Sequence, residues 1–363
     1  MPIFDLIAHP ETYYPCRQDM LRDVPFRDYW LDHFIHHFDL TARLAIEVYG
    51  GDAAERAAAC HADLQAEMQK LRRKPDAYGE LNLQVIGLIR QQCLKRHGIA
   101  DPYQHIKERE NSRCIEMFPS LVQELDRMAD AETVLEKLVL GVFAGNIFDL
   151  GASATATAYR EKGPAFLQVR DTIRHPWLID HFSEFTRWYF TTRPAKAAIF
   201  VDNAGSDIIL GILPLARWLA GRGTRVVLLA NDEPALNDIT AGELRRVIAD
   251  LSQRDATLEQ LCDRGMVSIA GSGGGTPLID LRRVSDECNA ACAGADLLIF
   301  EGMGRGLESN FDTAFVPACV KLCMIKEPII AERMGGKVFD VIFRFDPPAL
   351  FTRMPRARQS FAG

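Results

Sequence analysis

The feature that most constrains this chain is an alternation of short apolar runs with helix-length segments after residue 195. The runs cover residues 197–201, 226–230, 267–270, 297–300 and 338–345, and segments such as 241–250 and 285–293 lie between them. Parallel strands buried on both faces are nearly continuous apolar runs, and helices connect them. The pattern therefore predicts an α/β fold with a doubly wound, mostly parallel, Rossmann-like sheet.

The first half of the chain has a different pattern. Apolar residues recur at helical spacing in 39–46, 81–89, 121–125 and 182–189, which is typical of amphipathic helices. We therefore predict a helical domain over residues 1–190 and an α/β domain over residues 191–363. Asp101-Pro102 marks a helix start, and the polar face that follows is interpreted as solvated rather than functional. That face carries Lys107, Glu108, Glu110 and Asn111.

Composition and charge exclude several classes of function. The net charge is −7 and the pI is about 5.8, whereas nucleic-acid-binding proteins usually present a basic face. No apolar stretch approaches the roughly 20 residues that span a bilayer, and we see no secretory signal. Nine scattered cysteines without a Cys-x-x-Cys pair indicate reduced thiols. We expect a cytoplasmic protein without a nucleic-acid or membrane partner. Formation of a homo-oligomer is an open possibility.

Polar side chains follow the first two strands of the predicted sheet. Asp202 and Asn203 come directly after the run 197–201, and Asp238 lies shortly after the run 226–230. Ligands of open α/β sheets bind at the carboxyl ends of strands. Two carboxylates and an amide make an oxygen-rich site that suits a divalent metal. The alternative is that Asp202 and Asn203 only cap the next helix, predicted over 208–216.

Two further strand ends carry candidate anion-binding groups. The run 297–300 leads into Glu301-Gly302-Met303-Gly304-Arg305, where the guanidinium of Arg305 matches phosphate oxygens. Lys321 and Lys326 are candidates for a second phosphate-binding charge. The glycine-rich loop 271–276 is neither a P-loop nor a dinucleotide fingerprint, and a plain turn explains it as well as a phosphate cradle does.

Two other motifs have alternative interpretations. Asn146 and Asp149 are three residues apart, so they either face one ligand or cap a helix end. His33 and His37 share one helical face, but no metal-protease pattern accompanies them. Packing or surface roles are therefore favoured for these histidines and for His36.

The stretches 201–205, 234–240 and 301–305 together resemble the metal-dependent damage-control phosphatases, also known as the domain-of-unknown-function 89 family. The Glu-Gly-Met-Gly-Arg element resembles the mark of the second subfamily. That subfamily includes the C-terminal domain of pantothenate kinase 4-like proteins and stand-alone plant proteins. Residues 101–103 and 145–151 are also similar to it, and the likeness extends from about residue 100 to about residue 345.

The resemblance implies hydrolysis of a small phosphorylated metabolite, namely 4′-phosphopantetheine or its oxidised or damaged derivatives. Removal of the phosphate would keep damaged precursors out of coenzyme A. It also implies a divalent metal such as manganese, cobalt, nickel or magnesium. The implied metal-binding and catalytic residues are Asp202, Asn203 and Asp238. The implied substrate-binding residues are Glu301, Arg305 and Lys326. We also predict substrate binding by Asn146 and Asp149, which fall in a motif that resembles the same subfamily.

Several alternatives stay open at this point. The phosphoryl group could be attacked by a metal-activated water, or an aspartyl-phosphate could form on one of the acids. A doubly wound sheet could also hold S-adenosylmethionine in a methyltransferase, although the first strand lacks the expected glycine-rich turn. The third possibility is a non-catalytic module that binds phosphopantetheine-type ligands.

Overall fold

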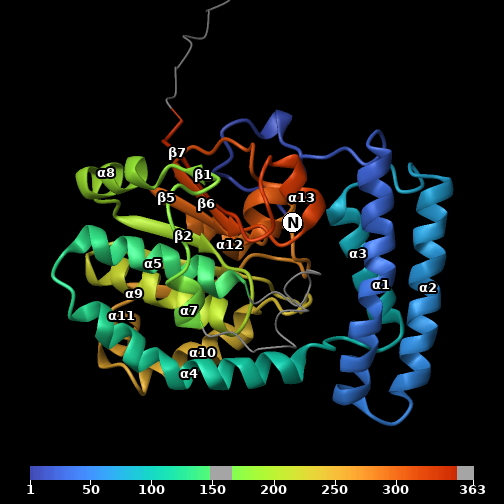
Figure 1. The fold of residues 1–363 in the computed structure, drawn as a ribbon, viewed down its shortest axis with the longest axis horizontal. Coiled ribbons are helices and arrows are strands. Elements are labelled where there is room, and N and C mark those ends of the chain that lie inside the picture. Colours follow the sequence, from blue (N-terminus) through green and yellow to red (C-terminus); the bar gives the residue numbers. More distant parts are fainter. Residues whose placement is uncertain (148–165, 350–363) are drawn as a thin grey trace, which may run out of the picture.

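The computed structural model describes residues 1–147 and 166–349, and its centre is a seven-stranded sheet (Figure 1). The strand order is β1-β7-β6-β5-β2-β3-β4. All neighbouring pairs are parallel except β6 and β7, which are antiparallel. The strands are β1 (Ile179–Asp180), β2 (Lys196–Phe200), β3 (Arg225–Ala230), β4 (Val267–Gly271), β5 (Leu297–Glu301), β6 (Ala318–Met324) and β7 (Val341–Asp346).

The sheet confirms the predicted α/β class and adds two strands that the apolar runs did not reveal. The five predicted runs are β2, β3, β4, β5 and β7. The chain passes from β2 to β3 and β4 on one side, then returns to β5 on the other side of β2. The order of the strands therefore reverses between β2 and β5, which is where open α/β sheets bind their ligands.

Helices and loops cover both faces of the sheet, as expected for a doubly wound fold. Along β2, Ala197 and Ile199 belong to one hydrophobic cluster, whereas Ala198 and Phe200 belong to another. Successive side chains of a strand point to opposite faces. The first cluster includes α4 (Gln104–Asp126), α5 (Ala131–Asn146), α8 (Phe182–Thr192), α9 (Leu213–Gly221), α10 (Ala241–Ser252) and α11 (Ala256–Asp263).

The second face is covered by less helix. Phe4 and Ile7 from the N-terminal segment pack there with residues of α12 (Asp286–Cys292) and with Phe315. The rings of Phe200 and Phe300 stack with centroids 4.5 Å apart on neighbouring strands. Aromatic pairs of this kind bury large apolar areas, so this face is fixed mainly by side chains of β2 and β5.

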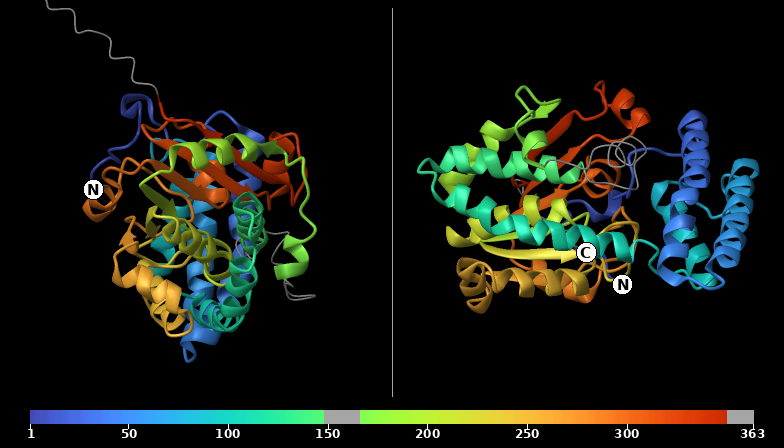
Figure 2. Two further views of the ribbon diagram at one scale, coloured as in Figure 1. Left: turned by 90° about the vertical axis from the view of Figure 1, so that its left-hand side faces the viewer. Right: turned by 60° about the horizontal axis from the view of Figure 1, so that its bottom comes forward.

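A separate helical layer lies at one end of the molecule, on the right of Figure 1 and of the right-hand view in Figure 2. It consists of α1 (Val24–Tyr49), α2 (Ala53–Arg73) and α3 (Leu83–Arg96). These helices share a hydrophobic cluster with Met303, Leu307 and Cys323 from the sheet half. The layer therefore packs against the carboxyl ends of β5 and β6, while α4, α5 and α8 share the core of the sheet. The division at residue 190 stays a prediction.

The remaining helical elements are short. They are η1 (Pro10–Thr12), α7 (Phe166–Arg170), η2 (Asp207–Ile212), η3 (Met303–Ser309) and α13 (Pro328–Arg333). The predicted helix over 208–216 is a π-helical turn, η2, continued by α9. Such turns are frequent at functional sites. Within residues 1–147 and 166–349, no helix combines the length and the apolar character that a membrane span requires.

Candidate active site

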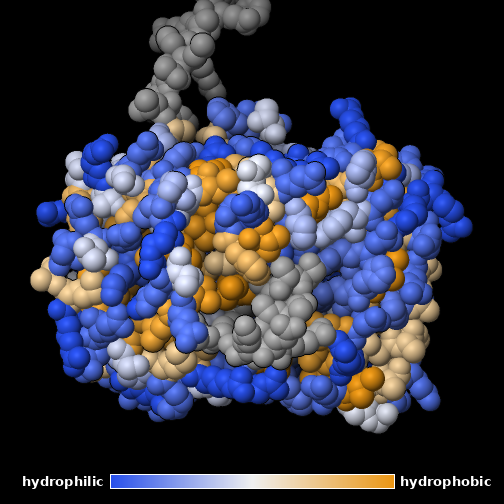
Figure 3. Space-filling model, in the orientation of Figure 1, coloured by the Kyte–Doolittle hydropathy of each residue, from blue (hydrophilic) through white to orange (hydrophobic). Residues whose placement is uncertain are grey.

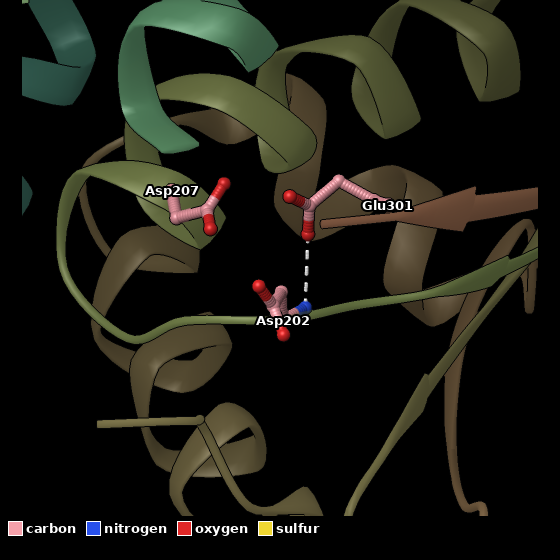
Figure 4. Close-up of side chains that lie close together, drawn as sticks. All are labelled: Asp202, Asp207 and Glu301. Carbon is pink, nitrogen blue, oxygen red and sulfur yellow. Dashed lines mark hydrogen bonds between the residues drawn. The ribbon is translucent and has the colours of Figure 1, made fainter. Parts of the chain in front are cut away.

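Asp202 and Asn203 directly follow β2, next to the end of β5. The backbone N–H of Asp202 donates to Glu301 Oε2 at 2.9 Å, and this bond joins the ends of the two strands. Figure 4 shows the Glu301 side chain reaching toward Asp202 and Asp207 from the end of β5. All three acids are at most 5% exposed, so they form a buried acidic cluster at the point where the strand order reverses.

Asp207, the first residue of η2, connects the acidic cluster with two amides. Its Oδ2 accepts from the backbone N–H of Asn203 at 3.2 Å and from Asn203 Nδ2 at 2.9 Å. Asn146 Nδ2 donates to the same oxygen at 2.9 Å and to Glu301 Oε1 at 2.7 Å. Asn146 is fully buried at the end of α5, and its amide therefore fixes the orientation of both carboxylates.

Asp238 reaches the site from the loop after β3. Residues Asn203 and Asp238 form an antiparallel bridge, and the N–H of Ile239 donates to the carbonyl of Asp202 at 3.0 Å. Asn231 Nδ2 donates to Asp238 Oδ2 at 3.1 Å. The structure thus brings together the three residues that the sequence pattern predicted as a group.

Arg305 in η3 is the basic residue that contacts these acids directly. Its Nη1 donates to Asp202 Oδ1 and, at 3.1 Å, to the carbonyl of Pro277, while its Nη2 donates to Asp238 Oδ2 at 2.8 Å. The guanidinium is 2% exposed. A buried charge needs a partner of opposite sign, and here the guanidinium bridges two acids that come from different strand ends.

Glycine is required where Glu301 leads into η3. Gly302 has φ +94°, and a Cβ on this residue would collide with the Asp202 carboxylate. Gly145 is similarly restricted, since a Cβ there would lie 2.7 Å from the carbonyl oxygen of Ser206. Both glycines therefore permit a close approach of backbone to the acidic cluster, in addition to the freedom that glycine gives the chain.

Burial and mutual repulsion shape the ionisation of the cluster. Burial raises the pKa of Asp202 well above its ordinary value, and Arg305 opposes that shift. The pKa of Glu301 is raised by burial and then by the charges of Asp207 and Asp202. For Arg305, burial opposes the charged form, but Asp238 and Asp202 outweigh burial and raise its pKa. The site therefore favours positive charge close to its acids.

Lys326 is the second base near these acids. It is fully buried two residues after β6, and its charge lowers the pKa values of Asp202, Asp207 and Glu301. Four buried acids thus face three buried bases, since Arg90 also interacts with Asp238, which leaves an excess of one negative charge when all seven groups are ionised. A divalent cation would offset that excess, and carboxylate and amide oxygens are suitable ligands for it.

Two sets of oxygen ligands are available for such a cation. Carboxylate oxygens of Asp202, Asp207 and Glu301 all lie within 4.8 Å of one another. Asp202, Asn203 and Asp238 form the other set, and these three line a cavity, whereas Asp207 and Glu301 do not. Every residue of the second set therefore reaches the cavity, whereas the first set reaches it through Asp202 alone.

The cavity lies between the carboxyl ends of the strands and the helical layer, and it has a volume of about 680 Å³ including its open mouth. Besides the three polar residues above, its walls come from α1, α3, η3 and the loops before α10, α12 and α13. The remaining lining residues of the cavity are Trp30, His33, Phe34, His37, Leu83, Arg90, Leu236, Pro277, Leu278, Met303, Gly304, Glu308 and Glu327. Figure 3 shows one face of the molecule, which is mostly hydrophilic with an apolar area near its centre.

Other predicted candidates lie elsewhere. Asp149 is outside the described residues. Lys321 lies within β6, where its ammonium donates to the carbonyls of Phe311 and Thr313 and pairs with Asp346 at 2.9 Å. Lys321 is therefore a structural residue of the β6–β7 pair. In the loop 271–276, the carbonyl of Gly274 accepts from two backbone N–H groups that follow Asn231, so this loop supports the segment before Asp238.

The sequence patterns missed Asp207 and the cavity-lining face of α1. Asp207 follows Asp202 by five residues, and the sequence patterns predicted no role for it. The sequence signal that could have identified Asp207 was the position of this acid two residues after Gly205, in the turn that follows a predicted strand. His33 and His37 were assigned to packing or surface roles, but both line the cavity. Their spacing was visible in the sequence, whereas their position opposite the strand ends depends on the tertiary fold.

Comparison with known proteins agrees with this arrangement. The sequence profile of the damage-control phosphatase ARMT1-like domain matches residues 41–342. A damage-control phosphatase of Arabidopsis thaliana is 40% identical over 294 residues, which cover 81% of this chain and 78% of that protein. A solved structure of a DUF89-family protein from Pyrococcus horikoshii has the same fold, with a TM-score of 0.60 and 17% identity over 86% of this chain and 96% of that one.

Other relatives are longer proteins. Pantothenate kinase 2 of Arabidopsis thaliana is 37% identical over 96% of this chain and 42% of its own length. The 4′-phosphopantetheine phosphatase of Mus musculus is 31% identical over 94% of this chain and 48% of its own length. The chain thus spans less than half of each of these two relatives. From the matched profile and the Arabidopsis phosphatase, we conclude that this chain belongs to the family of proteins with a damage-control phosphatase ARMT1-like domain.

Proposed function

We propose that this chain is a divalent-metal-dependent phosphomonoester hydrolase that acts on 4′-phosphopantetheine or on its oxidised or damaged derivatives. The observation that carries the proposal is that Asp202, Asn203 and Asp238 line an otherwise largely apolar cavity, while Arg305 contacts Asp202 and Asp238. Family membership supports the phosphatase activity over the methyltransferase alternative. The substrate follows from the name of the mouse relative, which aligns with 94% of this chain.

Asp202, Asn203 and Asp238 would hold the metal, and manganese, cobalt, nickel and magnesium all suit oxygen ligands of this kind. Their donor set fits the metal because it combines two carboxylates with an amide, faces the cavity and lies in a cluster with excess negative charge. When bound, a divalent metal would neutralise charge on the phosphoryl oxygens and activate a water. Asp207 and Glu301 would instead orient Asn203 and the backbone of Asp202 from behind.

The bases of the site would bind the phosphoryl group of the substrate. Phosphoryl transfer requires mainly positioning and positive charge on the three equatorial oxygens. Arg305 can present a planar fork of N–H donors to those oxygens, and the charge of Lys326 acts on the same acids as Arg305 does. Pairing with the substrate phosphate would require Arg305 to share or release the oxygens that it contacts on Asp202 and Asp238.

The experiment is phosphate release from 4′-phosphopantetheine by metal-stripped protein with each of the four metals added back. Wild type is compared with Asp202→Ala and Asp238→Ala, and with Asp312→Ala as a control, because Asp312 is an exposed acid that only pairs with Arg17 and Arg344. We expect metal-dependent release that both site variants lose and the control keeps. Release that does not depend on metal, or that survives in Asp202→Ala, would contradict the metal site. Ligand binding without any release would favour the non-catalytic module.

A further inference from the structure

The cavity that contains the proposed metal ligands continues along one face of α1. Trp30, His33, Phe34 and His37 line it, and their spacing places them on a single helical stripe. Building on the proposed function, we infer that this stripe binds the organic part of the phosphomonoester, the part that leaves as an alcohol. The stripe would select an elongated, uncharged arm with apolar and amide groups.

The stripe is continuous and has a suitable length. The rings of Trp30 and His33 meet edge to face with centroids 5.0 Å apart, and those of His33 and His37 stack at 5.8 Å. Phe34 also meets Trp30 edge to face, at 6.4 Å. Seven residues of helix separate Trp30 from His37, which corresponds to about 10 Å. An extended chain of several bonds can therefore lie along the stripe, whereas a very small ester would contact only part of it.

Another part of the cavity wall is apolar and includes an unusual backbone. It consists of Leu236, Pro277, Leu278 and Met303. Leu236 has φ +51°, a left-handed conformation that costs free energy for a leucine and that clusters at ligand sites. Since Leu236 precedes Asp238 by two residues, the same loop supplies a proposed metal ligand and part of the wall.

The polar groups of the cavity determine which arms fit. Imidazole nitrogens can donate to or accept from amide groups. His33 and His37 already interact with other residues of the protein, so an amide of the arm would share or replace those contacts. Two carboxylates, Glu308 and Glu327, line the same cavity, and they would repel a second anionic group on the substrate. Arg90 is the one guanidinium in this lining, and it is 5% exposed and donates to Thr41 at 3.2 Å. An arm that carries further phosphates is therefore disfavoured.

The test compares two esters that share a primary alkyl leaving group, 4′-phosphopantetheine and ethyl phosphate. The variants are Phe34→Ala and His37→Ala, both at partly exposed positions that should tolerate truncation. His36→Ala is the matched control, because His36 lies on the same helix but is exposed and bonds only locally to the carbonyl of Asp32. We expect about a 10-fold loss of kcat/KM for 4′-phosphopantetheine, mostly in KM, since pocket contacts of this size discriminate to that extent.

Ethyl phosphate hydrolysis should stay within about twofold of wild type in both variants. Equal losses for both esters, or a wild type that does not prefer the longer one, would overturn the inference.

A second readout needs no turnover. Saturation-transfer NMR should detect pantetheine on metal-free wild type and a weaker signal with Phe34→Ala. If wild type hydrolyses neither ester with any metal, the proposed function fails, and the pantetheine signal alone decides whether α1 binds the arm. Equal pantetheine signals from wild type and Phe34→Ala would refute binding of the arm by α1.

Discussion

Arg305 Nη2 and Asp238 Oδ2 form a 2.8 Å ion pair in which both side chains are 2% exposed. The same guanidinium also donates to Asp202 Oδ1. Arg305 therefore occupies oxygens of two residues that we propose as metal ligands. A metal ion and this guanidinium would compensate the same negative charge. A bound metal would therefore reduce the stabilisation that Arg305 gives to these acids, and Arg305 would reduce the stabilisation that a metal gives.

This relationship predicts how Arg305→Met responds to metal. Without metal, the variant should lose about 3–5 kcal/mol of stability, because removal of one partner leaves buried acids uncompensated. Manganese should then raise the melting temperature of the variant more than that of wild type. Thermal melting with and without manganese measures both effects. Arg282→Met is the control, since Arg282 pairs with Glu80 and Asp280 at a partly exposed position, and equal metal-induced shifts in wild type and Arg305→Met would contradict the competition.

The two ligand sets predict different outcomes for two isosteric variants. Asp238→Asn removes a charge from the cavity-facing set, and we expect metal affinity to fall by about 100-fold or more. Asp207→Asn changes a residue that orients Asn203 from behind, where loss of such a partner typically costs about 10–100-fold in affinity or activity. Calorimetric titration of metal-stripped protein measures both affinities. The opposite ranking would assign the metal to Asp202, Asp207 and Glu301.

The sequence predicted the parts of the fold that depend on local pattern. Buried parallel strands such as β2 and β5 are apolar throughout, so their positions and their polar ends could be identified without a structure. β6 could not, because Lys321 interrupts its apolar pattern and is tolerated only through carbonyls and an acid supplied by distant residues. The two residues of β1 are too few for any periodicity to appear.

Several members of the candidate site could be proposed from the sequence, but their arrangement could not. Asp202, Asn203, Asp238 and Arg305 each stood at a strand end or in a recognisable motif, and the structure places them together. The roles of Asp207 and of Asn146 depend on α5 packing against η2, a contact between segments 61 residues apart. Side-chain packing across such separations leaves no trace in local periodicity. The α1 stripe is a similar case, since only the tertiary fold sets it against the strand ends.

Buried thiols predict a pH dependence of stability. Burial raises the pKa values of Cys16, Cys60, Cys114 and Cys319 to about 12 from an ordinary value of 9.0. Their thiols stay protonated in the folded state while those of the unfolded chain ionise, so their contribution to stability is intact below pH 9 and is lost between about pH 9 and pH 12. Urea denaturation from pH 7 to pH 10.5 measures the decline.

A labelling experiment checks the same burial at constant pH. Of the nine cysteines only Cys262 is partly exposed, so a maleimide at pH 7.5 should label a single thiol quickly in native protein and all nine in urea. A Cys262→Ser variant serves as the control and should lose the fast phase. Rapid labelling of several thiols in the native protein would contradict the predicted burial.

Lys107 was predicted to lie on a solvated face, but it is buried and connects the helical half with the loop that carries Asp238. Its ammonium, 2% exposed on α4, pairs with Asp101 at 2.9 Å and with Glu243 at 2.8 Å. The other carboxylate oxygen of Glu243 accepts from the N–H of Thr240 at 2.8 Å in the capping box of α10. Only Ile239 lies between Asp238 and Thr240, so Lys107 holds the loop in place through Glu243.

Lys107→Met should therefore cost up to about 3 kcal/mol, since it leaves two partly buried acids without their buried base. It should also weaken metal binding, although Lys107 does not contact the proposed ligands. Lys95→Met is the matched control, because the pair of Lys95 with Glu233 is about half exposed and such pairs contribute at most about 1 kcal/mol. Denaturation and calorimetric metal titration separate the two effects. If Lys107→Met is destabilised but binds manganese as tightly as wild type, Lys107 only stabilises the fold. If the variant binds manganese more weakly at a temperature where it is fully folded, α4 positions Asp238.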